Sequence, residues 1–177
     1  MRRYSDGFTL IELMVTVSLA AILLATAVPS FKSTIQSNRL SAQANEFMLA
    51  MTYAKSEAVK RNTQVVVCSR ATDNSCSGDV NWDTGWLVFV DSDGDGVVSA
   101  GEEGGVLKVR SPLEAHNTLR AGTNSSIIFL NTGAFPAAVN TADVFNFCDD
   151  RGVSQGKKAK LSQPGWVQIE EGAAACP

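Results

Sequence analysis

The pattern of apolar and polar residues begins with one long apolar run, from Phe8 to Val28, that contains a single charged residue, Glu12. A helix of this length would measure roughly 31 Å, which matches the ~30 Å hydrocarbon core of a bilayer. The run therefore predicts a membrane-spanning helix. A carboxylate within it costs about 2.5 to 3.5 kcal/mol on insertion, and a cost of that size usually marks a functional group that has a partner.

Helical periodicity continues after Pro29, which lacks a backbone donor and is expected to kink the helix. Apolar residues form one broad stripe as far as Arg61, and Asn62 is predicted to end the helix. The stripe contains Phe31, Ile35, Leu40, Ala44, Phe47, Met51, Ala54 and Ala58. The pattern predicts a helix of about fifty residues whose second half needs a sheet to cover its stripe.

Short β-prone runs separated by turn-rich segments follow the helix, and several alternate in polarity as half-buried antiparallel strands do. They cover Thr63–Ser69, Gly85–Val90, Val106–Arg110, Ser126–Leu130, Val144–Cys148, Lys157–Ser162 and Trp166–Glu170. One helix followed by strands predicts an α+β fold, with the helix packed on an antiparallel sheet.

The sequence Met1-Arg2-Arg3-Tyr4-Ser5-Asp6-Gly7, followed by Phe8-Thr9-Leu10-Ile11-Glu12-Leu13, resembles the leader junction of type IV pilins and type II secretion pseudopilins. The resemblance implies that prepilin peptidase cuts between Gly7 and Phe8 and methylates the new Phe8 amine. It also implies that Glu12 pairs with the Phe8 amine of a neighbouring subunit during filament assembly.

Two alternatives to this interpretation of the N-terminus remain. Phe8 and Glu12 are one helical turn apart, so they could pair within one chain. An ordinary signal peptide is the other alternative, but the basic stretch is short, the apolar run is long, and no small-x-small cleavage site follows Pro29.

Length and charge indicate a single exported domain. Roughly 140 residues lie beyond the apolar run, enough for one domain with its own core. The net charge of −3 gives no indication of a polyanionic partner. Arg2 and Arg3 precede the run, whereas Lys32 is the only basic residue between it and Arg39. The positive-inside rule then predicts that the N-terminus is cytoplasmic and that the domain is exported. Together with the resemblance, this implies a single-pass inner-membrane protein with leader 1–7, membrane helix 8–29 and periplasmic domain 30–177.

The four cysteines, Cys68, Cys76, Cys148 and Cys176, form no Cys-x-x-Cys pair, and the single histidine gives little support to a zinc site. An even number in an exported domain predicts two disulfides. Among three connectivities we favour Cys68–Cys76, which closes a Ser/Thr/Asn-rich loop, and Cys148–Cys176, which ties down the tail. Free buried thiols are the alternative.

The end of the helix at Glu57–Arg61, the segment Trp82-Asp83-Thr84-Gly85-Trp86-Leu87-Val88-Phe89 and the Asp/Gly-rich turn after it resemble one family. This family contains the minor pilins of the FimT/FimU kind and the H-type minor pseudopilins. The resemblance extends to about residue 110 and implies the type IV pilin fold. For Trp86 we expect aromatic core packing under the helix.

The segment Asp91–Glu102 fits the spacing of an EF-hand calcium loop. Its oxygen donors are Asp91, Asp93, Asp95, the Val97 carbonyl, Ser99 and Glu102, and Gly96 occupies the sixth position. The flanking segments read as strands, so an ion would lie in a hairpin loop. A solvated Asp/Gly turn is the alternative, because turns use the same residues.

A basic cluster contains Arg151, Lys157, Lys158 and Lys160, and some FimT-like pilins bind DNA. Their Gly-Arg-x-Arg motif would fall at Gly165-Trp166-Val167-Gln168, where both arginines are absent. A solvated basic face is the simpler interpretation, and DNA is not expected as a partner. His116 near Glu114 has no recognisable nucleophile, and no phosphate loop occurs, so neither an enzyme nor a small-molecule substrate is expected.

The sequence thus predicts a structural minor pilin of a type IV pilus that primes assembly and stays near the filament tip. The main alternative is an H-type minor pseudopilin of a type II secretion system, and a DNA-binding pilin for transformation is the third. The expected partners are other pilins or pseudopilins, prepilin peptidase and the inner-membrane assembly platform. No cofactor is required, and calcium is the one ion that the sequence raises.

Overall fold

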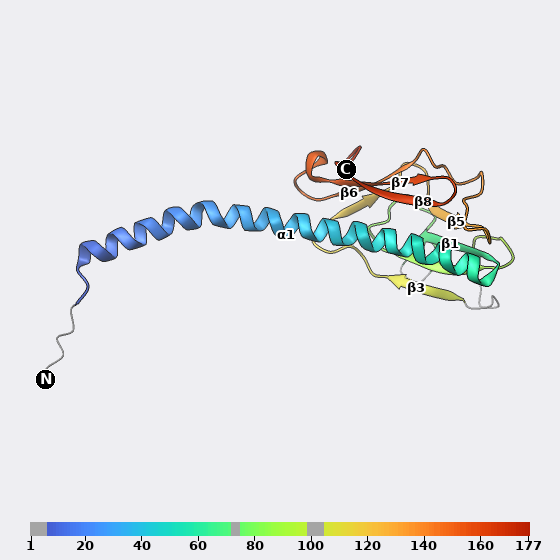
Figure 1. Cartoon of the computed structure of the whole chain (residues 1–177), viewed down its shortest axis with the longest axis horizontal. Coiled ribbons are helices and arrows are strands. Elements are labelled where there is room, and N and C mark those ends of the chain that lie inside the picture. The colour runs from blue at the N-terminus through green and yellow to red at the C-terminus, as the bar shows by residue number, and fades with distance from the viewer. Residues whose placement is uncertain (1–6, 72–74, 99–104) are drawn as a thin grey trace, which may run out of the picture. The chain divides into compact units, whose positions relative to one another are not determined.

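The computed structural model describes residues 7–71, 75–98 and 105–177. Its one long helix, α1, covers Leu10–Arg61 (Figure 1). The strands are β1 (Gln64–Ser69), β2 (Trp86–Asp91), β3 (Val106–Arg110), β4 (Thr118–Arg120), β5 (Ser126–Phe129), β6 (Val144–Cys148), β7 (Lys157–Ser162) and β8 (Trp166–Glu171), with a short 3₁₀ helix, η1, at Val153–Gln155. The predicted α+β fold, one long N-terminal helix followed by antiparallel strands, is confirmed.

Two units divide the chain between Asn38 and Arg39. In the first unit α1 is capped by Thr9, whose Oγ1 accepts a hydrogen bond from the backbone N–H of Glu12 at 3.3 Å. Pro29 lies inside the helix without ending it. None of the described residues from Gly7 to Arg39 is buried, and this segment is long and apolar enough to cross a membrane by length and composition.

The second unit contains two four-stranded antiparallel sheets where the sequence predicted one. The strand orders are β3-β2-β1-β5 and β4-β6-β7-β8. All seven predicted strands are present, with ends that differ by at most one residue. The eighth strand, β4, was not predicted, because its three residues are too few to show an alternating pattern.

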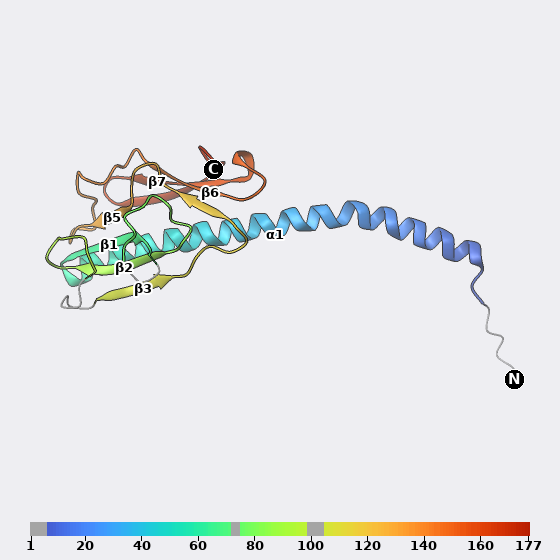
Figure 2. The ribbon, with the colours of Figure 1, turned by 180° about the vertical axis from the view of Figure 1, so that it is seen from behind.

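One face of α1 in the second unit packs against both sheets (Figures 1 and 2). Its buried residues are Leu40, Gln43, Ala44, Phe47, Ala50, Met51, Ala54, Glu57 and Ala58. Phe47 is central, because its ring meets Trp86 of β2 edge-on at 5.4 Å between centroids and Phe145 of β6 at 5.0 Å. Trp82 and Trp86 are both buried, as expected for core aromatics, whereas Phe31 and Ile35 of the predicted stripe are exposed.

The two central strands of the first sheet, β1 and β2, are buried on both faces, which the alternating pattern did not anticipate. Val65 and Val67 of β1 join the main core, while Val66 and Cys68 join a smaller cluster on the other face. Leu87 and Phe89 of β2 complete that cluster, and Cys76, Val98 and Ile128 pack against it. The loop closed by the Cys68–Cys76 disulfide therefore contributes to covering the outer face of the sheet.

A single buried carboxylate, that of Asp143, joins the loop after β4 to the segment before β6. It accepts backbone N–H groups from Gly122 at 2.7 Å, Thr123 at 2.8 Å, Asn124 at 2.8 Å and Val144 at 2.8 Å. Burial by itself would raise the pKa of Asp143, but these donors outweigh it and hold the pKa below the usual value. The single Asp143 carboxylate thereby accepts the hydrogen bonds of four backbone N–H groups.

Replacing Asp143 with Asn should lower the free energy of unfolding at neutral pH by about 2 to 3 kcal/mol, because charge-assisted hydrogen bonds to buried donors are lost. A carboxyl group whose pKa is lowered on folding stabilises the protein above its unfolded pKa, and this contribution is lost as the pH falls through the folded pKa. Asp143→Asn should therefore lose less stability than wild type between pH 4 and the acid limit, roughly pH 2. Thermal melts of full-length protein across this range measure both effects.

The control is Glu114→Gln, which changes an exposed carboxylate of the same unit that forms no salt bridge among the described residues. It should leave the neutral-pH melting temperature nearly unchanged. Equal loss of stability in the two variants would show that the Asp143 hydrogen bonds contribute nothing specific.

Candidate functional site

The predicted processing and assembly residues lie together at the start of the first unit. Phe8 precedes the first helical residue, Leu10, and its side chain is 77% exposed. Glu12 is also exposed and lies in the first turn of α1. Among the described residues Glu12 has no salt bridge. Its carboxylate is thus accessible to a group from outside the chain.

Glu12 also has a local role that the sequence analysis missed. Thr9-Leu10-Ile11-Glu12 has the Thr-x-x-Glu spacing of a capping box, and the half of the box donated by the Glu12 backbone is present. A carboxylate in the first turn also interacts favourably with the positive end of the helix dipole. The Thr-x-x-Glu spacing at the start of the apolar run is the signal in the sequence that indicates this cap.

Gly7 is not needed for the fold of the chain. A Cβ at this position would meet no other atom within 4 Å, and the residue is not in the left-handed region of backbone conformation. This differs from Gly85, which has φ 97° and whose Cβ would lie 2.0 Å from the Arg110 carbonyl oxygen. The fold of the described residues therefore gives no reason for glycine at position 7, and the predicted role of Gly7 in processing stays a prediction.

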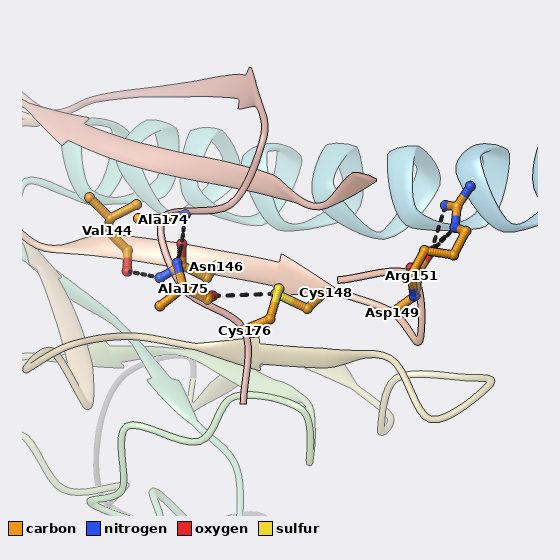
Figure 3. The surroundings of a disulfide bond; sticks show 8 residues. All are labelled: Val144, Asn146, Cys148, Asp149, Arg151, Ala174, Ala175 and Cys176. Atoms are coloured by element: carbon orange, nitrogen blue, oxygen red, sulfur yellow. Dashed lines mark hydrogen bonds and ion pairs between the residues drawn. A yellow bond between two sulfur atoms is a disulfide. The ribbon is translucent and has the colours of Figure 1, made fainter. Parts of the chain in front are cut away.

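The two disulfides have the connectivity that the sequence favoured. Cys68 pairs with Cys76, with 5.6 Å between Cα atoms, and Cys148 pairs with Cys176, with 5.8 Å. Figure 3 shows how the second bridge holds the C-terminal tail against β6. There the Asn146 side chain accepts the Ala174 N–H at 2.6 Å and donates to the Val144 carbonyl at 3.3 Å.

Three aspartates of the predicted calcium loop come together in the structure. One carboxylate oxygen from each of Asp91, Asp93 and Asp95 lies within 4.8 Å of the others. Asp91 is buried, and its carboxylate already accepts the Gly94 N–H at 2.9 Å and the Gln64 side-chain amide at 2.7 Å. Such bonds also stabilise a plain Asp/Gly turn. Three of the six predicted ligands therefore have a suitable position and chemistry.

Of the remaining predicted ligands, Val97 is exposed, and Ser99 and Glu102 lie outside the described residues. The observed hydrogen bonds are those of an Asp/Gly turn, and the calcium hypothesis stays a prediction.

The predicted basic cluster is neutralised by neighbouring acids. Lys158 and Lys160 both pair with Glu170, at 3.4 and 2.9 Å, and Lys157 pairs with Glu171 across the β7–β8 register. Arg151 Nη2 lies 2.6 Å from Asp149 Oδ2. Burial raises the pKa of Asp149, but the hydrogen bonds from Arg151 outweigh it and lower the pKa. These pairings favour the interpretation as a solvated face, as proposed from the missing arginines.

His116 lies in a strained turn and not in a catalytic arrangement. Both Ala115 and His116 have positive φ, 60° and 58°, which non-glycine residues rarely adopt. Gln43 of α1 holds this turn by donating to the Glu114 carbonyl at 3.4 Å and accepting from the Asn117 side chain at 2.7 Å. The turn therefore has a structural explanation.

Comparison with known proteins identifies the family. The model of the family "Type II transport protein GspH" matches residues 43–165, and the prokaryotic N-terminal methylation motif matches residues 2–28. The chain belongs to the GspH family. Its fold and family are those of structural pilin and pseudopilin subunits. No curated protein sequence matches the chain.

Two solved structures of the type IV minor pilin FimU from Pseudomonas aeruginosa share the fold. One superposes with a TM-score of 0.60 at 21% identity and covers 80% of this chain and 98% of FimU. The other, from a second crystal form, has a TM-score of 0.58 at 19% identity and covers 77% and 99%. At this identity the likeness shows the fold of this GspH-family protein.

The calcium hypothesis predicts that the melting temperature of the full-length protein rises with calcium and that magnesium mimics it poorly. A hundredfold excess over Kd corresponds to about 2.7 kcal/mol of added stability. Glu102→Ala should abolish the response by removing the bidentate ligand, whereas Glu103→Ala in the same loop should retain it. Melting curves indifferent to calcium and chelator in all three proteins would establish a plain turn.

Proposed function

We propose that this chain is a minor pilin of a type IV pilus that primes filament assembly at the inner membrane and lies near the filament tip. The observation that carries the proposal is the contrast within α1. Before Arg39 the helix has no buried residue among those described, although it is mostly apolar, and from Leu40 onward it supplies the core of the second unit. Such a surface needs a cover outside the chain.

In the membrane, lipid would cover this surface, and in the filament the neighbouring subunits would cover it. The prokaryotic methylation motif at residues 2–28 supports processing by prepilin peptidase between Gly7 and Phe8, with methylation of the new Phe8 amine. The fold itself makes no demand for glycine at position 7. This supports a role for Gly7 in access of the peptidase to the bond before Phe8.

Within the filament, the Glu12 carboxylate would pair with the Phe8 amine of the neighbouring subunit. A charge in an apolar setting is costly when it has no partner, so the pair would favour one longitudinal register between helices. The capping role gives Glu12 a competing local explanation. The two roles differ in one property: a cap tolerates glutamine, whereas an ion pair requires the charge.

Replacing Glu12 with Gln therefore separates the two roles. If the ion pair acts in assembly, Glu12→Gln should lower incorporation of the chain into sheared filaments by about tenfold, corresponding to roughly 1.4 kcal/mol. Its level in the membrane should not fall, because an uncharged residue inserts more easily. Immunoblots of filament and membrane fractions measure both quantities.

The control is Thr9→Ala, which removes the side-chain cap and keeps the carboxylate. It should retain most of the incorporation. If Thr9→Ala is defective and Glu12→Gln is not, then Glu12 caps the helix and the pairing model is wrong.

The specific alternative is an H-type minor pseudopilin of a type II secretion system, and the match to the GspH family model favours it. Both assemblies would use the same helix in the same way. DNA uptake receives no comparable support, because Lys157, Lys158 and Lys160 have acidic partners in the fold.

Deleting the gene from its native bacterium discriminates between the two assemblies. The proposal predicts loss of surface pili and of twitching motility, with secretion of type II substrates retained, and recovery on complementation. Loss of secretion with normal piliation would assign the chain to the type II system instead.

A further inference from the structure

A groove of about 660 Å³ lies wholly within the second unit, between α1 and the start of β8. Its lining is mainly apolar: Met48, Met51 and Val59 come from the helix, and Trp166 and Val167 from the strand. Trp166 is 60% exposed and Val59 52%. Trp166 is the one aromatic side chain classed as exposed among the described residues of this unit.

The turn between β7 and β8 holds Trp166 in a fixed position. Gly165 has φ 100°, and a Cβ there would lie 2.1 Å from the Gly133 carbonyl oxygen, so the turn packs directly on the neighbouring backbone. Lys55 of α1 donates from Nζ to the Gly165 carbonyl at 3.1 Å and lies 4.3 Å from the centre of the Trp166 ring. The groove is thus preformed, which lowers the ordering cost of binding.

Lys55 differs from the other lysines that line or flank this region. Lys60 lies 3.7 Å from Glu57, and Lys158 and Lys160 share Glu170. No carboxylate in residues 7–71, 75–98 or 105–177 forms a salt bridge with Lys55. Its ammonium group is half-buried and contacts a carbonyl and an aromatic ring. The groove therefore offers apolar surface around one positive charge that has no counter-charge.

We propose that this groove is the docking surface for an acidic, apolar segment of a neighbouring pilin-type subunit. One Asp or Glu of that segment contacts Lys55 Nζ, and its apolar side chains contact Met48, Val59 and Trp166. The proposal rests on the proposed function, since it names a partner within the same filament. An ion pair between a carboxylate and a fixed ammonium group is stronger in a mainly apolar groove than at a fully exposed site.

A peptide fits these observations better than a nucleic acid does. A phosphate backbone binds through several cations along its path, and Lys60, Lys158 and Lys160 already have acidic partners. The Lys55 amine also occupies one face of the Trp166 ring, so that face is not free to stack on a base. A single carboxylate with apolar neighbours matches Lys55 and the apolar lining of the groove.

Site-specific photocrosslinking of the full-length chain in its native bacterium tests the proposal. A benzoyl-phenylalanine at Ser56, an exposed residue that lines the groove, should form a crosslink to another pilin-type subunit. Mass spectrometry should locate the crosslink in a segment that contains Asp or Glu. Lys55→Met should lower the crosslink yield by about tenfold through loss of a charge-assisted contact, whereas Lys55→Arg should retain most of it.

The matched control is Lys108→Met, which removes an exposed lysine from β3 and should leave the yield unchanged. Equal levels of each variant in the membrane fraction ensure that yields are compared at equal abundance. A crosslink to nucleic acid, a crosslink to an unrelated protein, or a yield that Lys55→Met does not change would overturn the proposal.

A second crosslinker at Ile22 distinguishes failure of this proposal from failure of the proposed function. Ile22 is 64% exposed in the apolar part of α1, where filament packing itself is expected. Crosslinks to pilin-type subunits from Ile22 but not from Ser56 would reject the groove and retain the filament role. Absence of such crosslinks from both positions would reject the groove and count against the filament role.

Discussion

The constraint on which this protein depends is the apolar surface of α1 before Arg39. Burial of a large apolar side chain is worth about 1.5 to 3 kcal/mol, and the described chain leaves many such side chains of this segment uncovered. The second unit has no comparable deficit, because Phe47, Trp82 and Trp86 are buried in its own core. The core of the second unit therefore depends on α1 from Leu40 onward, whereas the proposed assembly depends on the uncovered segment before Arg39.

Phe47 explains how a single helix organises two sheets. Its ring contacts Trp86 in the first sheet and both Phe145 and Phe147 in the second. Edge-to-face and tilted pairs of this kind fix ring orientations as well as burying area. The buried carboxylate of Asp143 adds polar connections where the loop after β4 meets the segment before β6. Apolar packing and one charge together hold the strands around the helix.

The sequence predicted the parts of the fold whose physical signal is local. The helix is visible as a stripe from Leu40 to Ala58, and seven strands are visible as β-prone runs between turns. The division into two sheets was not predicted, because strand partners depend on tertiary contacts that no run of residues records. Strands β1 and β2 are covered on both faces, partly by a disulfide loop, which removes the alternation expected of half-buried strands.

The sequence predicted candidate sites only where their residues form a sequence motif. Glu12 was recognisable as the one charge in a long apolar run, and the leader junction by its resemblance to pilins, whereas spacing alone indicated the three aspartates that converge in the β2–β3 loop. The groove at Lys55 could not be found in this way, because Lys55 and Trp166 are brought together by the turn at Gly165 and have no common motif. For the segment Gly165-Trp166-Val167-Gln168 the sequence showed only that the two arginines of the DNA-binding motif are absent.

The distribution of charges separates two tasks in assembly. Many charged side chains of the second unit form salt bridges within that unit, for example Glu57 and Arg61 at 2.6 Å. Among the described residues, Glu12 and Lys55 form no salt bridge, and they share this property with other charged residues such as Lys32, Lys108 and Glu114. Glu12 lies in the matched N-terminal methylation motif, and in the proposed filament it would set the register between helices without selecting among subunits that carry the same motif. Lys55 lies beside Trp166 in the groove between α1 and β8. A site of this kind could distinguish between partners, because discrimination requires contacts that only one partner can make.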